Sequence, residues 1–424
     1  MQQPWIDAYS DPKADIQTFS SCLALADLNA DGDFKLILAD FGNGTNTKLK
    51  VFKGTSMSVE LPLISPPSAI TTLYTEKGEP HIPDIVVASG SSVLVYRNCR
   101  PYFKFSLPAQ DCSSLEADLW QQKSQTNYNQ LVQLLQELSI ELGFSNLSPS
   151  SQKLLSIEPH LREDFLNKCN VSLQKQMVIT CVATINKNIP DEKDVSCLLL
   201  GTESGQLYVM DPETFTLINS FLLTGIPYII CATGVYLIEY RIIFTCRNGS
   251  IYLLKSGNIR YICQLSSLPV SMVLVSRNIV ITSMDCTLQS ISMKGRKQWS
   301  VSLPGNVTCM TAMPLTGLAL NLIAVALDNG AVHLYNGAQL CYAFNMSDHI
   351  SSMIFGQYGR EEHALVSISS SGAIGIKLLK RTAQFKNDRM DSTNDIHHGI
   401  KLLIPKKSKL IVEQTLRERQ QCKG

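Results

Sequence analysis

The hairpin in residues 197–210 decides the fold, and it reads CLLLGTESGQLYVM. An apolar run at 197–201 leads into the turn Glu203-Ser204-Gly205, and an alternating apolar run follows at 206–210. Glycine accepts the positive φ that tight hairpin turns require, so a Ser-Gly pair between two apolar runs predicts two antiparallel strands.

The same pattern of apolar run, turn and alternating run recurs along the chain. The other copies turn near residues 42–44, at Gly90-Ser91, and at Asn248-Gly249, Asp285-Cys286, Asn329-Gly330 and Ser371-Gly372. From Gly205 onward the turns are spaced by about 40 residues, which is the size of a four-stranded propeller blade. Seven copies therefore predict an all-β fold, a seven-bladed β-propeller.

Closure of the ring needs one more strand. A single blade cannot bury both of its faces, whereas stacking around a ring buries them and protects the sheet edges. The last blade lacks a clear outer strand. We expect either the apolar run at residues 400–412 or the segment at residues 5–9 to complete it.

The step from the second turn to the third is too long for one blade by roughly 70 residues. The intervening leucines Leu131, Leu134, Leu135, Leu138 and Leu142 fall on one helical face. Residues 113–116 resemble a capping box, and Ser148-Pro149 resembles a helix start. A short α-helical insertion between the second and third blades is predicted, which either packs on the propeller flank or forms a docking surface.

The predicted organisation follows from these patterns. Residues 1–112 hold blades 1 and 2, residues 113–170 hold the helical insertion, and residues 171–412 hold blades 3–7 and the closure of the ring.

The composition fits a large apolar core and gives no strong overall charge. Apolar residues make up 45% of the chain, charged residues 17%, and the formal net charge is +1, so no whole-molecule field would attract nucleic acid or an anionic membrane. No basic stretch with an apolar core opens the chain, and no apolar run reaches the length of a membrane span. The 13 cysteines are odd in number and most stand in apolar β-like runs, which favours a reducing, cytoplasmic setting.

One stretch needs a test for metal binding. Residues 27–33 read DLNADGD, with oxygen ligands at alternate positions and glycine at the sixth, like a calcium loop. The twelfth position is Leu38 where an EF-hand needs Glu, and the ninth is Lys35 where integrin-type propellers need a carboxylate. The pattern favours a polar turn in the first blade, with a calcium-dependent extracellular propeller as the alternative.

Motifs of catalysis are missing from the sequence. It contains no nucleophile elbow, no phosphate-binding glycine loop and no HExxH. We therefore predict no catalytic, cofactor-binding or metal-binding residue and no enzyme activity.

Several stretches carry a family resemblance: TFSSCLALADL at 18–28, RPYFKFSLP at 100–108, CRNG at 246–249, YGRE at 358–361, LKRTA at 379–383 and QTLRER at 414–419. In order and spacing they resemble the amino-terminal propeller region of the Bardet–Biedl syndrome protein 1 family. Its members are subunits of the BBSome, a coat-like complex that moves membrane proteins in cilia. Tryptophan–aspartate repeat propellers are less similar, because the chain has no Trp-Asp dipeptide.

The resemblance implies a function that composition cannot give. It implies a seven-bladed propeller with a helical insertion that acts as a non-catalytic scaffold. The implied partners are a GTP-bound Arf-like small GTPase, other BBSome subunits and ciliary membrane-protein cargo, with no nucleic acid. The implied location is the cytoplasm, the cilium and its base, and the ciliary membrane, where the complex binds peripherally. Residues 413–424 would then begin a linker to a further C-terminal region. The alternative is a generic propeller adaptor of another vesicle or intraflagellar transport complex.

The resemblance also implies where the GTPase binds, which is on the first and last blades. The candidate partner-binding residues are Asp31, Asp33, Lys35, Tyr358, Arg360, Glu361 and Arg381. Ordinary turn and strand-end roles are the alternative, for example Arg360 pairing locally with Glu361 or Glu362. The family tends to have a glycine-rich turn in the last blade, whereas this chain has Ser369-Ser370-Ser371-Gly372, which leaves the turn geometry open.

Overall fold

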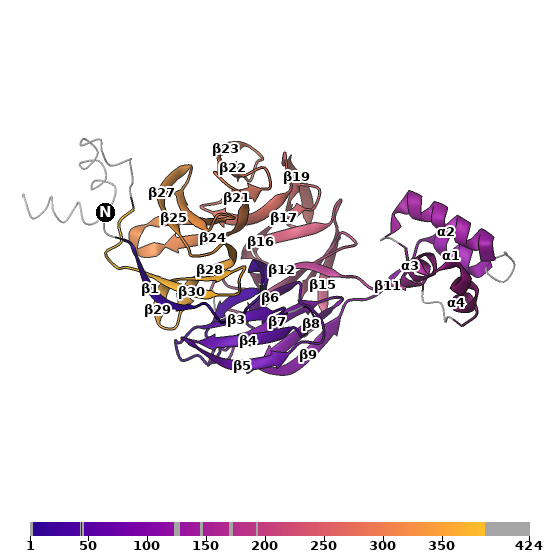
Figure 1. Cartoon of the computed structure of the whole chain (residues 1–424), viewed down its shortest axis with the longest axis horizontal. Helices are drawn as coiled ribbons and strands as arrows, with labels where there is room; N and C mark the ends of the chain where they lie inside the picture. The colour runs from indigo at the N-terminus through magenta and orange to yellow at the C-terminus, as the bar shows by residue number, and fades with distance from the viewer. Residues whose placement is uncertain are drawn as a thin grey trace, which may run out of the picture. The chain divides into compact units, whose positions relative to one another are not determined.

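Four-stranded antiparallel units make up the main body of the chain, and two of them join into one eight-stranded sheet through a parallel contact of Asn186 with Val235 (Figure 1). The computed structural model describes residues 3–42, 44, 46–122, 128–144, 147–168, 173–191 and 194–385. The chain divides after Arg381 into two units, and every element named below lies in the first. The predicted strand at 400–412 and the predicted linker at 413–424 lie outside the described residues.

The described strands form seven blades, and in each blade we name the strands A to D in hydrogen-bonded order from the innermost. Blade 1 holds β2 (Leu23–Ala26), β3 (Lys35–Asp40), β4 (Lys48–Lys53) and β5 (Ser56–Pro62); blade 2 holds β6 (Ala69–Leu73), β7 (Asp84–Ser89), β8 (Ser92–Arg97) and β9 (Arg100–Ser106). Blade 3 holds β12 (Ile179–Asn186), β13 (Ser196–Thr202), β14 (Gln206–Met210) and β15 (Leu217–Leu222); blade 4 holds β16 (Pro227–Val235), β17 (Glu239–Cys246), β18 (Ser250–Lys255) and β19 (Asn258–Gln264).

The remaining blades follow the same order. Blade 5 holds β20 (Pro269–Val275), β21 (Asn278–Ser283), β22 (Thr287–Ser292) and β23 (Lys297–Ser302); blade 6 holds β24 (Val307–Leu315), β25 (Leu320–Leu327), β26 (Ala331–Asn336) and β27 (Gln339–Asn345). Blade 7 holds β28 (Ile350–Tyr358), β29 (Glu361–Ser369), β30 (Ile374–Leu379) and, as its outer strand, β1 (Trp5–Asp11).

The N-terminal strand closes the ring. β1 pairs antiparallel with β30, from Trp5 opposite Leu379 to Asp11 opposite Ile374 (Figure 1). The innermost strands contact one another in sequence from β2 through β6, β12, β16, β20, β24 and β28, and β28 returns to β2. The segment around Trp5 is thus the closing strand, as one of the two sequence-based alternatives predicted.

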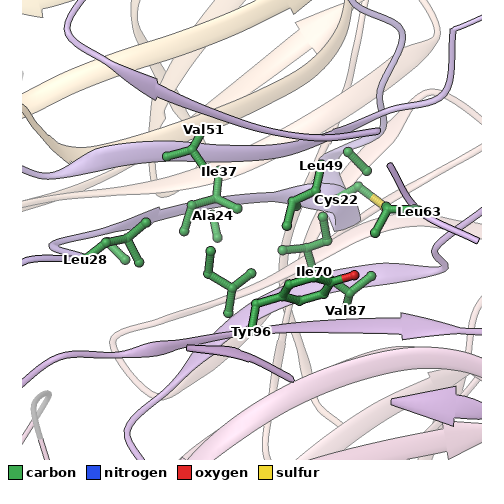
Figure 2. Close-up of a cluster of buried hydrophobic side chains, with 13 residues drawn as sticks. Cys22, Ala24, Leu28, Ile37, Leu49, Val51, Leu63, Ile70, Val87 and Tyr96 are labelled. Carbon is green, nitrogen blue, oxygen red and sulfur yellow. The ribbon is translucent and has the colours of Figure 1, made fainter. Parts of the chain in front are cut away.

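The core lies between the blades. Every residue of β3 and β13 is buried, because each sheet is covered by a neighbouring blade on both faces. Figure 2 shows one such interface, where Ile37 and Leu49 of the first blade face Ile70 and Val87 of the second. Burying one such side chain contributes roughly 1.5–3 kcal/mol, so each interface is a large part of the stability.

The hairpin turns use glycine where the backbone demands it. Gly205 and Gly330 have φ of +76° and +80°, whereas the fifth blade places Cys286 at φ +56° in the same position. In the serine-rich turn of the last blade, Gly372 is the residue with a positive φ, at +89°. A Cβ at this position would lie 2.8 Å from the Ile16 nitrogen. The turn therefore forms without further glycines.

The described helices gather between the second and third blades in the chain. They are α1 (Ser114–Gln121), α2 (Tyr128–Leu142), α3 (Pro149–Ser156) and α4 (Arg162–Lys168), flanked by the short paired strands β10 (Gln110–Asp111) and β11 (Gln174–Lys175). Trp120, Leu131, Leu135 and Leu154 form part of a separate buried cluster. Leu134 was expected on that face but is 40% exposed, because it stands about 100° around the helix from Leu135. None of the helices among the described residues is long and apolar enough to cross a membrane.

The predicted helix starts are present, with one difference. Ser113 Oγ accepts the Glu116 N–H at 3.2 Å, and Ser148 Oγ accepts the Ser151 N–H at 3.4 Å with Pro149 in the first turn. Glu116 does not complete a reciprocal capping box. Its buried carboxylate instead accepts the Ser148 N–H at 2.9 Å and the Ser151 hydroxyl at 2.5 Å, which joins α1 to α3.

Candidate functional site

The A–B and C–D turns of all blades lie on one face of the propeller, which we call the AB/CD face. The B–C turns and the connections from each D strand to the next blade lie on the opposite face, because the strands of a blade alternate in direction. Asp31 and Asp33 are in the A–B loop of blade 1, and Arg360 is in the A–B turn of blade 7. Arg381 follows the C strand of blade 7, so the candidate residues share the AB/CD face.

The A–B loop of blade 1 is organised by its own carboxylates. Asp27 accepts backbone N–H groups from Asn29 at 3.3 Å, Asp31 at 3.2 Å and Gly32 at 2.8 Å. Asp31 in turn accepts the Asp33 N–H at 3.0 Å. The loop is thus a hydrogen-bonded polar turn, and among the described residues no group of three or more His, Cys, Asp or Glu side chains is arranged to hold a metal ion.

One lysine pairs with two of the aspartates in this loop. Lys53 Nζ lies 3.1 Å from Asp33 Oδ2 and 3.9 Å from Asp31 Oδ2. The hydrogen bond from the Asp33 N–H lowers the pKa of Asp31, and the side chain of Asp27 and the positive charges of Lys53 and Lys35 act in the same direction. Asp31 is therefore an exposed, ionised group near neutral pH.

Backbone hydrogen bonds join this loop to the last blade. The Phe34 N–H donates to Gly359 O at 2.9 Å, and the Gly359 N–H donates to Phe34 O at 2.8 Å. The Tyr358 hydroxyl donates to Gly54 O at 2.5 Å, in the C–D turn of blade 1. Loops from opposite ends of the sequence are thereby held as one surface.

Two of the candidate partner-binding residues are largely buried. Tyr358 is 6% exposed and Lys35 is 7% exposed, because the joined loops of blades 1 and 7 cover them. Burial raises the pKa of Tyr358, and the negative charge of Asp33 adds to that shift. Both side chains therefore pack within the joined loops.

Arg360, Glu361 and Arg381 line one cavity of about 400 Å³ between blades 6 and 7. Its other lining residues are Leu315, Gly317, Leu318, Glu362, His363, Leu379 and Lys380. No ion pair among the described residues joins Arg360 to Glu361 or Glu362, so the local pairing considered from the sequence is not formed. The blade 7–1 surface, as we call Asp31, Asp33, Arg360, Glu361 and Arg381, thus combines the cavity with the neighbouring acidic loop.

Sequence reasoning missed several residues of this surface. Leu318 lies in the 3₁₀ turn Thr316–Leu318 of blade 6, is 43% exposed and lines the cavity. It stands among other apolar residues in the sequence, so no local pattern predicts that it is exposed. Lys53 joins the surface only through its tertiary pairing with Asp33. Lys380 stands beside Arg381 in the stretch that carried the family resemblance, and that adjacency was the available signal.

Comparisons with known proteins identify relatives of the chain. The family described as "Ciliary BBSome complex subunit 1" matches residues 5–255. The human "BBSome complex member BBS1" is 39% identical over 423 residues, which cover 98% of this chain and 71% of the relative. The mouse protein of the same name is 38% identical over 422 residues, with the same coverage of both chains.

Solved structures with a similar fold agree with these relatives. Two crystal structures of BBS1N in complex with ARL6DN, one soaked with mercury and one with lead, superpose with a TM-score of 0.73 at 29% identity. The matches cover 91% of this chain and 99% or 100% of the solved chains. On the strength of the family match, the identity across nearly the whole chain and the shared propeller, the chain belongs to the family of ciliary BBSome complex subunit 1.

Proposed function

We propose that the chain is a non-catalytic interaction scaffold of the BBSome coat and that it binds a GTP-loaded Arf-like small GTPase through the blade 7–1 surface. Binding of the GTPase would recruit the complex to the ciliary membrane, where the coat sorts membrane-protein cargo together with other BBSome subunits. The chain would then act in the cytoplasm and at the cilium and its base, peripherally on the membrane.

One observation carries this proposal. The loops at Phe34 and Gly359 are hydrogen-bonded into one surface, and that surface offers exposed charges of both signs beside a cavity lined by leucine and charged side chains. A surface of this kind suits a folded partner better than a small metabolite, because charge complementarity over separate loops fixes orientation. The complexes of related propellers with ARL6DN support the choice of a GTPase as that partner.

Binding is expected to depend on the bound nucleotide. The switch loops of a small GTPase are ordered only while the γ-phosphate is present, so a rigid receptor surface that contacts them prefers the GTP form. The blade 7–1 surface is preorganised in this sense, since backbone pairs and the buried Tyr358 hydroxyl fix its loops.

The test is a binding titration with the GTPase loaded with a GTP analogue or with GDP. Replacing Arg360→Glu together with Arg381→Glu should weaken binding of the GTP form at least tenfold, which corresponds to about 1.4 kcal/mol, because both side chains line the cavity. The matched control is Lys13→Glu with Arg247→Glu, which changes the net charge equally on the opposite face and should leave affinity within threefold.

Two results would count against the proposal. One is equal binding of the GTP and GDP forms, which would favour a propeller adaptor that does not read the nucleotide. The other is an affinity within threefold of the unmodified chain for the Arg360→Glu, Arg381→Glu variant, which would place the GTPase elsewhere.

A further inference from the structure

Charge is distributed unevenly between the blades. The whole chain holds 37 basic and 36 acidic residues, but residues 214–327 hold eight Lys and Arg against two Asp and Glu. This segment runs from the outer strand of blade 3 (β15) through blades 4 and 5 to the first two strands of blade 6. The near-neutral total therefore conceals one strongly basic part and a compensating acidic remainder.

Seven of these eight basic residues stand at the strand ends on the AB/CD face. Arg277 is in the A–B turn of blade 5, Lys294 and Arg296 are in its C–D turn, and Lys297 begins β23. Arg241, Lys255 and Arg260 occupy the same ends of the blade 4 strands. Arg247 and the acidic Asp285 are in B–C turns, on the opposite face. The topology thus concentrates the positive charge on one side.

The turns that carry these charges are in contact across the blade boundary. Arg260 Nη2 donates to Met293 O at 2.6 Å, and Gly295 packs so tightly that a Cβ there would lie 2.6 Å from Ile262 O. A cavity of about 480 Å³ between the blades is lined by Arg241 and Arg277. The charges therefore form one continuous surface, and we call Arg260, Arg277, Lys294, Arg296 and Lys297 the blade 4–5 basic surface.

This positive charge is mostly unpaired. Glu239 is the one acidic residue at these strand ends of blades 4 and 5, and it already binds Arg241 Nη2 and Lys255 Nζ, each at 2.9 Å. The ion pairs formed between described residues include none of the five members of the blade 4–5 basic surface. All five side chains belong to exposed residues, so they are open to an external anion.

Two large aliphatic side chains project from the same face. Leu237 is 62% exposed and Ile238 is 75% exposed, both in the A–B turn of blade 4, immediately before Glu239. The turn is held rigidly, since the Leu237 N–H donates to Lys187 O at 3.2 Å and the Ile238 N–H donates to Val235 O at 3.1 Å. Exposed aliphatics on a fixed turn beside unpaired cations are the combination found in proteins that lie on anionic membranes.

We propose that this part of the AB/CD face contacts an anionic lipid bilayer directly. The blade 4–5 basic surface binds headgroup phosphates and carboxylates, while Leu237 and Ile238 enter the boundary between headgroups and acyl chains. An acidic protein segment satisfies the charges equally well, but it leaves two rigidly exposed aliphatic side chains without a role. The blade 7–1 surface is on the same face, so a membrane-bound GTPase and the bilayer can be engaged from one side.

The experiment is sedimentation of the purified 424-residue chain with lipid vesicles, without any GTPase. Vesicles of phosphatidylcholine with phosphatidylserine should bind the chain, vesicles of phosphatidylcholine alone should not, and added salt should weaken binding. The variant Lys294→Glu with Arg296→Glu should lower binding at least tenfold, because it reverses two exposed charges in one turn. Leu237→Ser with Ile238→Ser should lower binding at constant charge.

A matched control separates local charge from total charge. Lys13→Glu with Arg247→Glu makes the same change in net charge on the opposite face and should bind anionic vesicles as the unmodified chain does. Equal loss of binding in this control, or equal binding to both kinds of vesicle, overturns the proposal. So does retention on poly-glutamate beads without vesicle binding, which assigns the surface to an acidic protein. Lys294→Glu with Arg296→Glu should leave GTPase affinity within threefold, so the two surfaces are tested separately.

Discussion

Tyr358 shows how one buried side chain can hold together the loops of the proposed binding surface. Its ring is buried with Leu36 and Leu38 of the first blade, and its hydroxyl reaches Gly54 O, 304 residues away in the sequence. The hydroxyl therefore fixes the C–D turn of blade 1 against the A–B turn of blade 7. Its contribution to GTPase binding is expected to be indirect, through the position of the loops.

Removing this hydroxyl tests that role. Tyr358→Phe keeps the ring and removes the donor to Gly54 O, so we expect a loss of about 1 kcal/mol of unfolding free energy. A chain of this size should show a small fall in melting temperature, roughly 1–3 °C. GTPase affinity should stay within threefold, because the side chain is not at the surface.

The comparison variant is Tyr261→Phe, in which the ring is 53% exposed on β19 and the melting temperature should not change. If Tyr358→Phe abolishes GTPase binding while the fold remains intact, the hydroxyl bond to Gly54 O is essential to the surface and not the modest contribution expected here.

The sequence alone does not predict the burial of Lys35 and Tyr358, and the physical reason is the same for both residues. Both are polar residues at strand ends, where exposure is the ordinary outcome. Their covering atoms come from the other end of the chain through the Phe34–Gly359 pair. Arg360, Glu361 and Arg381 line one cavity, and their positions at turns and strand ends follow from local patterns.

At the scale of elements, Glu116 ties the helical insertion together. Its side chain is fully buried, and its carboxylate accepts the backbone N–H of Ser148 and the hydroxyl of Ser151. The indole N–H of Trp120 donates to the same Ser151 hydroxyl at 2.8 Å. One carboxylate thus joins the first turn of α1 to the first turn of α3, inside a cluster composed of insertion residues.

Glu116→Ala should loosen the insertion and leave the blades unchanged. The variant leaves the Ser148 N–H buried without its acceptor, which costs about 1–3 kcal/mol. Hydrogen exchange should quicken within residues 114–168, while amides of β13 and β17 keep their protection. Glu141→Ala removes an exposed carboxylate from α2 and should have no effect. Equal loosening of the blades in Glu116→Ala would mean that the insertion and the propeller unfold together.

The elements differ in how far the sequence could predict them. The hairpin turns carry glycine at a positive φ, so Gly205, Gly249 and Gly330 marked the blades within a few residues of their places. Both helix starts were marked by serine caps. The sequence leaves two alternatives for the closing strand, because β1 has few buried residues and its partner β30 is more than 360 residues away along the chain.

At the scale of the whole molecule, ring closure controls access to the thiols. Cys22 lies between the first and second blades, and Cys181 and Cys197 lie between the third and fourth. Burial raises the pKa of Cys22 to about 11 and the pKa values of Cys181, Cys197 and Cys309 to about 12. All eleven cysteines among the described residues are free thiols, so oxidation after unfolding is a hazard that a reducing compartment avoids.

Thiol titration therefore reports whether the ring is closed. The reactive species is the thiolate, so at pH 8 a buried thiol with a pKa near 12 is protected twice, by lack of access and by protonation. With Ellman's reagent we expect Cys22, Cys181, Cys197 and Cys309 to remain unreacted in the folded chain and to react at once in guanidinium chloride.

Deleting residues 1–11 removes β1 and exposes the edge of β30, so the same thiols should react faster without denaturant. Cys286→Ser, at a turn, should remove one early-reacting thiol and change none of the others. Rapid reaction of the buried thiols in the intact chain would mean that the blades separate readily, and a truncated chain with unchanged protection would mean that β1 does not hold the ring closed.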